Sequence, residues 1–266
     1  MTPLAVESVG RHDAPAVALL HGWLGDRRDW DEVVAALGDA GRLRLLRVEL
    51  PGHGASPPAA PGGLPAAAAA LWAALDAVGV GRVALVGYSM GGRLALTAAL
   101  LAPARCTGIA VIAASPGIDD AAARVARAGL DDARADELLR LGLPRFVQDW
   151  YAQPLFQGLA GDAAARAALG ARREDGDAVA IAATLRALSV GRQPPLAARL
   201  AELPPGSEWV AGELDSAYAE LARRSAAASP EGRVTIVPGC SHALLQEAPA
   251  AVAAAIAAVA GFDRGG

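Results

Sequence analysis

The sequence contains no lysine, so all 24 of its basic residues are arginine. Because arginine supplies every ordinary surface cation, a single arginine is only a weak sign of an anion-binding site. The net charge is −4, and aromatic residues make up only 4% of the chain. Nucleic-acid-binding proteins typically carry clustered positive charge and stacking aromatics. We therefore expect no nucleic-acid partner.

Long apolar runs, targeting signals and a cysteine framework are also absent. No apolar stretch reaches the ~18 residues of a membrane-spanning helix without a charge, glycine or proline. The first residues, MTPLAVESVGRHD, lack a basic segment followed by an apolar core. We expect no membrane partner and a cytoplasmic location. The only cysteines are Cys106 and Cys240, and we expect two buried thiols rather than a disulfide.

Patterns of metal and cofactor sites are missing as well. The four histidines, His12, His21, His53 and His242, stand singly along the chain. The sequence has no H-E-x-x-H motif, no C-x-x-C motif and no phosphate-binding P-loop. We expect neither a metal nor a cofactor.

The chain has 266 residues and is 53% hydrophobic, enough for one large core. Short apolar runs rich in β-branched residues alternate with longer helical patterns, which predicts an α/β fold with a mostly parallel central sheet and crossover helices. The expected strands span residues 4–9, 16–21, 43–50, 82–88, 107–114, 207–211 and 233–238. The expected helices span residues 29–40, 64–78, 90–102, 216–228 and 248–260.

The strand pattern stops between residues 115 and 200, where mostly helical segments follow one another. We interpret this region as a helical cap inserted into a core domain made of residues 1–114 and 201–266. The alternative is a set of packing helices with no role over a site.

A serine between glycines follows a predicted buried strand in the segment VALVGYSMGG. Ser89, with Gly87 and Gly91 on either side, forms a G-x-S-x-G pattern just before an expected helix. A sharp strand-to-helix turn strains its central residue, and small neighbours relieve the crowding while the hydroxyl projects above the sheet. Ser89 is therefore the candidate reactive residue, and a plain turn serine is the alternative.

A serine hydroxyl needs a base to take its proton. In such sheets the partners follow in the order serine, acid, histidine, and only His242 comes after Ser89. For the acid, the segment SEWVAGELDSAY offers Glu213 and Asp215. We favour Asp215 because it lies beyond the turn at a helix start, where its alternative role is a helix N-cap.

The segment VALLHGWLGDRRDW can supply an oxyanion site. A turn at His21 after a strand can aim the backbone amide of Trp23 at the point reached by the amide of Met90. Two such donors stabilise developing negative charge. We expect structural roles for His21 and for His53 in the loop ELPGHGAS.

These segments carry a family resemblance. The pieces LLHGW, LPGHG, VGYSMGG, GELD and the histidine before QEAP together resemble the α/β-hydrolase fold superfamily. The pieces LHGWLGDRRDW, GYSMGGR, QDWYAQPLF and LSVGRQPPLAARL are similar to the 2-succinyl-6-hydroxy-2,4-cyclohexadiene-1-carboxylate (SHCHC) synthases of menaquinone (vitamin K2) biosynthesis. The piece at 149–156 is the more specific match, because general esterases have no reason to share a cap sequence.

The resemblance implies a cofactor-free lyase that eliminates pyruvate from a small anionic substrate, 2-succinyl-5-enolpyruvyl-6-hydroxy-3-cyclohexene-1-carboxylate. By the family's proposed mechanism, His242 and Asp215 polarise Ser89, whose oxygen takes a proton beside the succinyl carbonyl. The amides of Trp23 and Met90 would then stabilise an enolate-like charge.

Several carboxylates on such a substrate require cations, since burying unpaired carboxylates is costly. Arg93 lies one helical turn beyond Ser89 and can face the same pocket, with packing on the sheet as its alternative. The resemblance implies further substrate-binding positions at Tyr88, Arg127, Trp150 and one of Arg172 and Arg173, and Arg124 is a further candidate because it lies one helical turn from Arg127. Plain surface charge and core packing are the alternatives for these positions.

One position departs from the superfamily pattern, because Ser241 stands where glycine usually precedes the histidine. Ser241 fits if the backbone there needs no positive φ. Two other functions stay open. One is a serine hydrolase of the same fold that cleaves an ester or a C–C bond of a small carboxylate-bearing substrate. The other is a ligand-binding module without catalysis.

Overall fold

The central strands are apolar on both faces, and this pattern determines the fold. All six residues of β4 (Val83–Tyr88) are buried. Leu85 belongs to the hydrophobic cluster on one face of the sheet, whereas Ala84 and Val86 belong to the cluster on the other. Successive side chains of a strand point to opposite faces, so a continuous apolar run suits a sheet covered on both sides.

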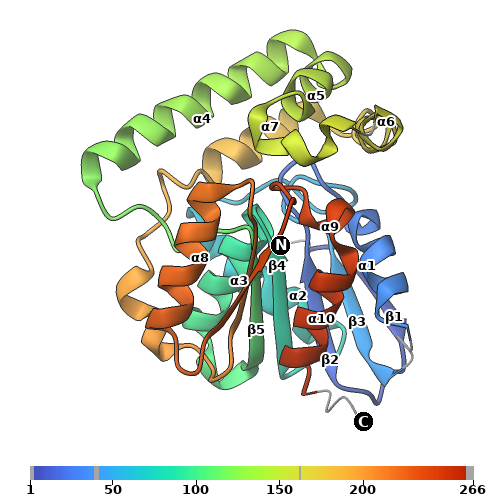
Figure 1. Ribbon diagram of the computed structural model, residues 1–266, viewed down its shortest axis with the longest axis vertical. Coiled ribbons are helices and arrows are strands. Elements are labelled where there is room, and N and C mark those ends of the chain that lie inside the picture. Colours follow the sequence, from blue (N-terminus) through green and yellow to red (C-terminus); the bar gives the residue numbers. More distant parts are fainter. Residues whose placement is uncertain (1–2, 39–41, 162, 262–266) are drawn as a thin grey trace.

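The computed structural model describes residues 3–38, 42–161 and 163–261. It contains a seven-stranded sheet in the order β1-β3-β2-β4-β5-β6-β7 (Figure 1). Strand β1 pairs antiparallel with β3, and every other pairing is parallel, as expected from the sequence. The other strands are β1 (Val6–Gly10), β2 (Ala16–Leu20), β3 (Arg44–Val48), β5 (Cys106–Ile112), β6 (Glu208–Gly212) and β7 (Arg233–Val237).

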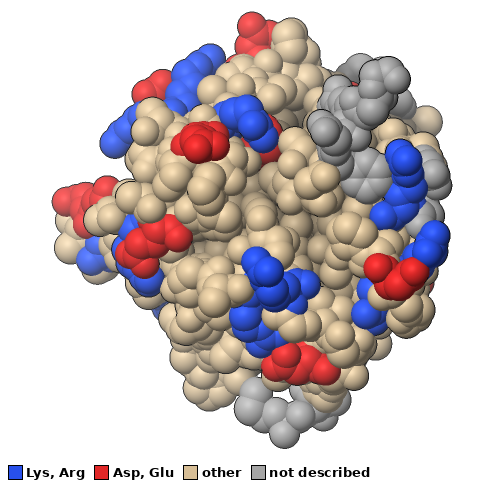
Figure 2. Space-filling model, turned by 90° about the horizontal axis from the view of Figure 1, so that it is seen from below, with Lys and Arg blue, Asp and Glu red and all other residues tan. Residues whose placement is uncertain are grey.

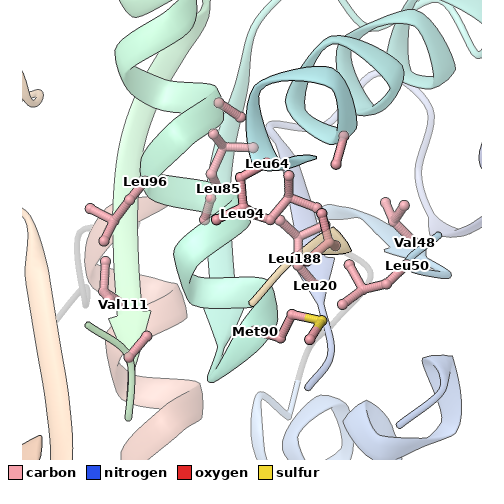
Figure 3. Close-up of a cluster of buried hydrophobic side chains, with 14 of the residues drawn as sticks. Leu20, Val48, Leu50, Leu64, Leu85, Met90, Leu94, Leu96, Val111 and Leu188 are labelled. Carbon is pink, nitrogen blue, oxygen red and sulfur yellow. The ribbon is translucent and has the colours of Figure 1, made fainter. Parts of the chain in front are cut away.

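Helices cover both faces of this sheet (Figure 1). One face packs against α2 (Gly63–Ala77), α3 (Met90–Leu101) and α8 (Ser216–Ala228), whose buried residues join the larger apolar cluster. Part of this cluster is shown in Figure 3. The opposite face packs against α1 (Asp31–Ala36) and α10 (Pro249–Val259).

A group of helices from the middle of the chain lies above the carboxyl ends of the strands (Figure 1). They are α4 (Ala121–Leu141), α5 (Leu143–Tyr151), α6 (Ala163–Ala171) and α7 (Ala178–Ala187), with the 3₁₀ helix η4 (Pro154–Gly161). The 3₁₀ helix η5 (Ala197–Glu202) lies beside α8 instead. The helical content expected for this region is confirmed, and the division into domains at residues 114 and 200 stays a prediction.

Several predicted ends differ from the structure for local reasons. Strand β5 stops at Ile112 because Ala113 adopts a positive φ of 45°. The helix expected over 29–40 begins as a 3₁₀ turn, η1 (Arg27–Trp30), and continues as α1, while residues 39–40 lie outside the described residues. The helix expected over 248–260 is α10, which begins at Pro249 because the residue preceding a proline disfavours helical backbone; Ala248 separates it from the short α9 (Leu244–Glu247).

The surface features match a chain of mixed charge. On the face seen in Figure 2, opposite α4–α7, basic and acidic side chains are interspersed over a mainly uncharged surface. Within the described ranges, no helix is long and apolar enough to cross a membrane. Both cysteines are free thiols, as expected, but only Cys106 is buried; Cys240 is half-buried because it lies in the exposed loop after β7.

Candidate active site

Ser89 occupies a strained turn between β4 and α3. Its backbone has φ 52° and ψ −112°, a conformation that residues other than glycine rarely adopt. The Ser89 amide donates to the carbonyl of Ile112 at 2.8 Å, which holds the turn in place. The strain is typical of functional serines at such turns.

The flanking glycines allow the backbone to approach closely around Ser89. A Cβ atom on Gly91 would overlap the carbonyl groups of Leu20 and His21, and one on Gly87 would overlap the carbonyl of Gly91. Alanine at either position would therefore force backbone to move. The predicted steric need for small residues in this turn is confirmed.

Ser89, His242 and Asp215 form one hydrogen-bonded chain. His242 Nε2 lies 3.0 Å from Ser89 Oγ, and His242 Nδ1 lies 2.7 Å from Asp215 Oδ2. Since Asp215 can only accept when ionised, Nδ1 carries the proton and Nε2 is free to accept from the serine. Glu213 points elsewhere, because its carboxylate accepts from the amide of Gly239 at 2.9 Å.

The loop before His242 accommodates serine in place of glycine. The positive φ in this loop falls at Gly239, at 67°, and Ser241 does not share it. Both the amide and the hydroxyl of Ser241 donate to the carboxylate of Glu247. Glu247 therefore connects the loop before His242 to α9. Its only signal in the sequence is its place in the segment QEAP, which follows the histidine.

His21 and His53 join two loops on the same edge of the sheet. The amide of Leu50 donates to His21 Nε2 at 3.0 Å, and the amide of Leu24 donates to His53 Nε2 at 3.2 Å. Burial, reinforced by His21, lowers the pKa of His53 to about 3, so this ring is neutral. The structure thus supports the structural roles expected for both histidines.

The turn held by these histidines lies beside Ser89. A Cβ atom on Gly22 would lie 3.5 Å from Ser89 Cβ and 2.9 Å from the ring of Tyr88. Within the described residues, the backbone amides of Trp23 and Met90 donate no hydrogen bond. Both amides are therefore available to a ligand, as an oxyanion site requires.

A small cavity of about 40 Å³ opens at Ser89. Aromatic side chains from α5 and η4 close it from above: the ring of Trp150 lies 5.1 Å from that of Trp23 and 5.7 Å from that of Phe156. Tyr88 and Trp150 both line this space, where the sequence placed them. Other lining residues are Gly22, Asp29, Tyr151, Arg173, His242 and Gln246. A volume of this size holds little more than water, so a larger ligand requires these helices to move.

Arg93 is a buried cation without an acidic partner. Its guanidinium donates to the carbonyl of Leu188 at 2.7 Å and to Gln193 Oε1 at 3.3 Å. In the part of the chain that the structure describes, no carboxylate lies within ion-pair distance of it. Burial lowers its pKa to about 10, so the group is still protonated at neutral pH.

The structure separates Arg172 from Arg173. Arg173 is buried and lines the Ser89 cavity, where its Nη2 lies 2.6 Å from Asp29 Oδ1 and its Nε lies 3.3 Å from the Tyr151 hydroxyl. Arg172 is half-buried and, together with Arg173, lines a second cleft of about 360 Å³. Of the two, only Arg173 reaches the cavity.

The arginines of α4 take different directions. Arg124 donates to the carbonyls of Ile118 and Asp119, at 3.0 and 2.7 Å, and so caps the turn before its own helix. This geometry argues against the substrate contact expected for Arg124. Arg127 donates to Asp131 at 3.0 Å and interacts electrostatically with Arg93.

Two further residues of α4, Asp131 and Arg134, lie beside Arg127 and were not predicted from the sequence. Arg134 lies 3.4 Å from Asp131 and places its guanidinium 4.9 Å from the centre of the Trp150 ring. Asp131 itself is fully buried. Among the described residues, no group of three or more His, Cys, Asp or Glu side chains could hold a metal ion.

Comparison with known proteins places this geometry in a family. Residues 17–255 match the model of the alpha/beta hydrolase family. The chain is 35% identical over 250 residues to 2-succinyl-6-hydroxy-2,4-cyclohexadiene-1-carboxylate synthase of Enterobacter sp. (strain 638), covering 94% of this chain and 93% of the relative. The synthase of Escherichia coli O1:K1 / APEC is 34% identical over 253 residues, covering 95% and 96%.

A solved structure agrees with the sequence relatives. MenH from S. aureus superposes with a TM-score of 0.88 at 26% identity and covers 97% of this chain and 98% of its own. The chain belongs to the alpha/beta hydrolase family and, within it, to the family of 2-succinyl-6-hydroxy-2,4-cyclohexadiene-1-carboxylate synthases.

Proposed function

We propose that this enzyme eliminates pyruvate from 2-succinyl-5-enolpyruvyl-6-hydroxy-3-cyclohexene-1-carboxylate in menaquinone biosynthesis. Relatives that align over almost the whole chain are named 2-succinyl-6-hydroxy-2,4-cyclohexadiene-1-carboxylate synthase, after the product of this reaction. The fold hosts many chemistries, so the assignment also needs support from the site itself.

The observation that carries the proposal is the buried guanidinium of Arg93, which has no carboxylate within ion-pair distance among the described residues. It lies one helical turn from Ser89, and its hydrogen bonds go to a carbonyl and an amide oxygen. Burying a cation without an anion is costly, and an anionic ligand removes that cost. A substrate with several carboxylates fits this site, whereas a neutral ester does not need it.

Ser89 acts as the base in the proposed reaction. His242, held by Asp215, accepts the hydroxyl proton, and the Ser89 oxygen takes the proton from the ring carbon beside the succinyl carbonyl. The electron pair moves through the ring double bond and breaks the bond to the enolpyruvyl oxygen. The ring diene forms, and the enolate released becomes pyruvate when its methylene carbon gains the proton held by His242.

The amides of Trp23 and Met90 support the charge that develops on the succinyl oxygen. Each is free to donate, and one such donor contributes ~3 kcal/mol to barrier lowering in acyl-transfer enzymes. Aromatic rings above the cavity exclude water once the ligand is bound.

The same residues support a second candidate, hydrolysis through an acyl-enzyme. The specific observation is that Ser89 has both a histidine at 3.0 Å and two free amide donors, which are the requirements of a serine nucleophile. The two candidates differ in whether the serine oxygen bonds to the substrate.

Pyruvate release from the enolpyruvyl substrate, followed together with diene absorbance, tests the proposal. We expect equal amounts of both products. Ser89→Ala should lower kcat by about 10² or more, the usual contribution of a positioned base. Arg93→Met should raise KM, while Arg199→Met, which removes an exposed arginine paired with Glu202, should change neither constant.

Two results would contradict the elimination. One is release at the spontaneous rate with wild-type protein. The other is a burst of p-nitrophenol from an ester with a stable acyl-enzyme on Ser89 and no action on the enolpyruvyl substrate, which would establish hydrolysis instead.

A further inference from the structure

Asp131 is a buried carboxylate in the middle of α4, and three groups bind it. Arg127 Nε donates to it at 3.0 Å, Ser189 Oγ donates at 2.7 Å, and Arg134 Nη1 lies 3.4 Å away. Its side chain is 1% exposed. A buried carboxylate with these partners fixes their positions, because each of them would lose a charge-assisted bond by moving.

Ser189 connects Asp131 to the segment that holds Arg93. The Ser189 hydroxyl accepts from the amide of Gly191 at 3.1 Å, and a Cβ on Gly191 would overlap the backbone of α4. The side chain of Leu188 lies in the apolar cluster with Leu94 (Figure 3), and its carbonyl accepts from Arg93. One short segment thus links α4 to α3.

The charges in this region do not balance. Arg93, Arg127 and Arg134 all interact with the carboxylate of Asp131, and Arg134 also interacts with Glu137. Tyr218, which interacts with the same groups, stays neutral because burial raises its pKa. The guanidinium groups outnumber the carboxylates with which they interact, which suits an anionic ligand. Arg173, which lines the Ser89 cavity, is by contrast already paired with Asp29 at 2.6 Å.

We propose that Asp131 is a positioning residue for substrate carboxylates. It holds Arg127 directly and holds Arg93 through Ser189 and the carbonyl of Leu188, so that both guanidinium groups face the anionic substrate in a fixed arrangement. This inference rests on the proposed function, because it assigns the two arginines to that substrate.

The direction in which Asp131→Asn changes substrate binding distinguishes positioning from simple charge balance. Asp131→Asn keeps the shape but removes the negative charge. If Asp131 only reduced the positive field, the variant would bind an anion more tightly. We expect the opposite, a KM raised about tenfold or more with kcat changed far less, because the arginines lose their fixed geometry.

A matched control is available at the next residue. Asp132 pairs with Arg192 at 2.7 Å, so it also links α4 to the segment after α7, but both side chains are partly exposed. Asp132→Asn should leave KM unchanged. Ser189→Ala removes the link to Asp131 without changing any charge, and it should also raise KM. This variant tests the inference independently if Asp131→Asn folds poorly.

Binding of 2-succinylbenzoate, a stable molecule with a ring carboxylate and a succinyl chain, gives a readout without catalysis. Calorimetry should show weaker binding by Asp131→Asn, and this effect should shrink in an Arg127→Ala background. Tighter or unchanged binding by Asp131→Asn, or equal effects of Asp132→Asn, would overturn the inference. If the wild-type protein neither releases pyruvate nor binds the probe, the proposed function itself fails.

Discussion

Arg172 and Arg173 are neighbours in the chain with opposite surroundings. Arg173 is buried between Asp29 and Tyr151, whereas Arg172 is half-buried and does not line the Ser89 cavity. We expect Arg172→Ala to leave activity and stability nearly unchanged. Arg173→Ala should abolish most activity and also destabilise the fold by about 3–5 kcal/mol, because Asp29 is left as an unpaired buried charge.

A double variant separates these two effects of Arg173. Arg173→Ala combined with Asp29→Asn removes the stranded charge, so denaturant unfolding should show that much of the stability returns. Pyruvate release should stay low because the cation is still missing. Recovery of activity in the double variant would mean that Arg173 serves only to neutralise Asp29.

The junction of β4 and α3 depends on contacts between backbones. Gly91→Ala brings a Cβ onto the carbonyls of Leu20 and His21, so we expect a loss of about 1–3 kcal/mol in unfolding free energy. Gly129 in α4 is the matched control because nothing lies within 4 Å of its Cβ position. Gly129→Ala should stabilise the protein by about 0.5–1 kcal/mol through helix propensity. Similar values for the two variants, measured by urea unfolding, would contradict this account.

Strands and helices were predictable where burial follows a regular period. The seven strands lie within a few residues of their predicted positions, and α8 spans the predicted residues 216–228. The ends that differ depend on single backbone conformations, such as the positive φ of Ala113, that no periodicity reports.

Some residues of the site were also predictable from the sequence, and others were not. Ser89, Asp215 and His242 were found from chain order and strand ends, which the fold determines. Asp29 was missed because its partner Arg173 is 144 positions away. Asp131 has local partners in Arg127 and Arg134, but its burial and its bond to Ser189, 58 positions away, are not visible in the local pattern. Such pairings depend on how α4–α7 pack over the sheet, and local pattern does not encode that packing.

At the level of the whole molecule, the site is assembled between the sheet and the helices above it. The amide of His242 donates to the carbonyl of Leu155 in η4 at 3.1 Å, and Trp23 Nε1 donates to the carbonyl of Ile181 in α7 at 3.1 Å. The helices over the sheet therefore contact both His242 and the turn that contains Trp23. Because the cavity of about 40 Å³ is too small for the proposed substrate, binding requires these contacts to loosen and re-form.

The buried His53 should make the fold sensitive to acid. Burial holds its pKa at about 3 in the folded protein, below its ordinary value of 6.5. The unfolded chain therefore binds a proton that the folded chain does not. The stabilisation is complete above about pH 6.5 and is lost as the pH falls toward 3, by about 1.4 kcal/mol per pH unit between about pH 6 and 4.

His53→Gln isolates this contribution, because glutamine can accept from the amide of Leu24 and does not titrate. Urea unfolding at a series of pH values should show a shallower loss of stability below about pH 6 in His53→Gln than in the wild type. His12→Gln, which removes an exposed histidine, should follow the wild-type slope. If His53→Gln also follows the wild-type slope, the acid sensitivity arises from other groups, and His53 does not resist protonation in the folded state.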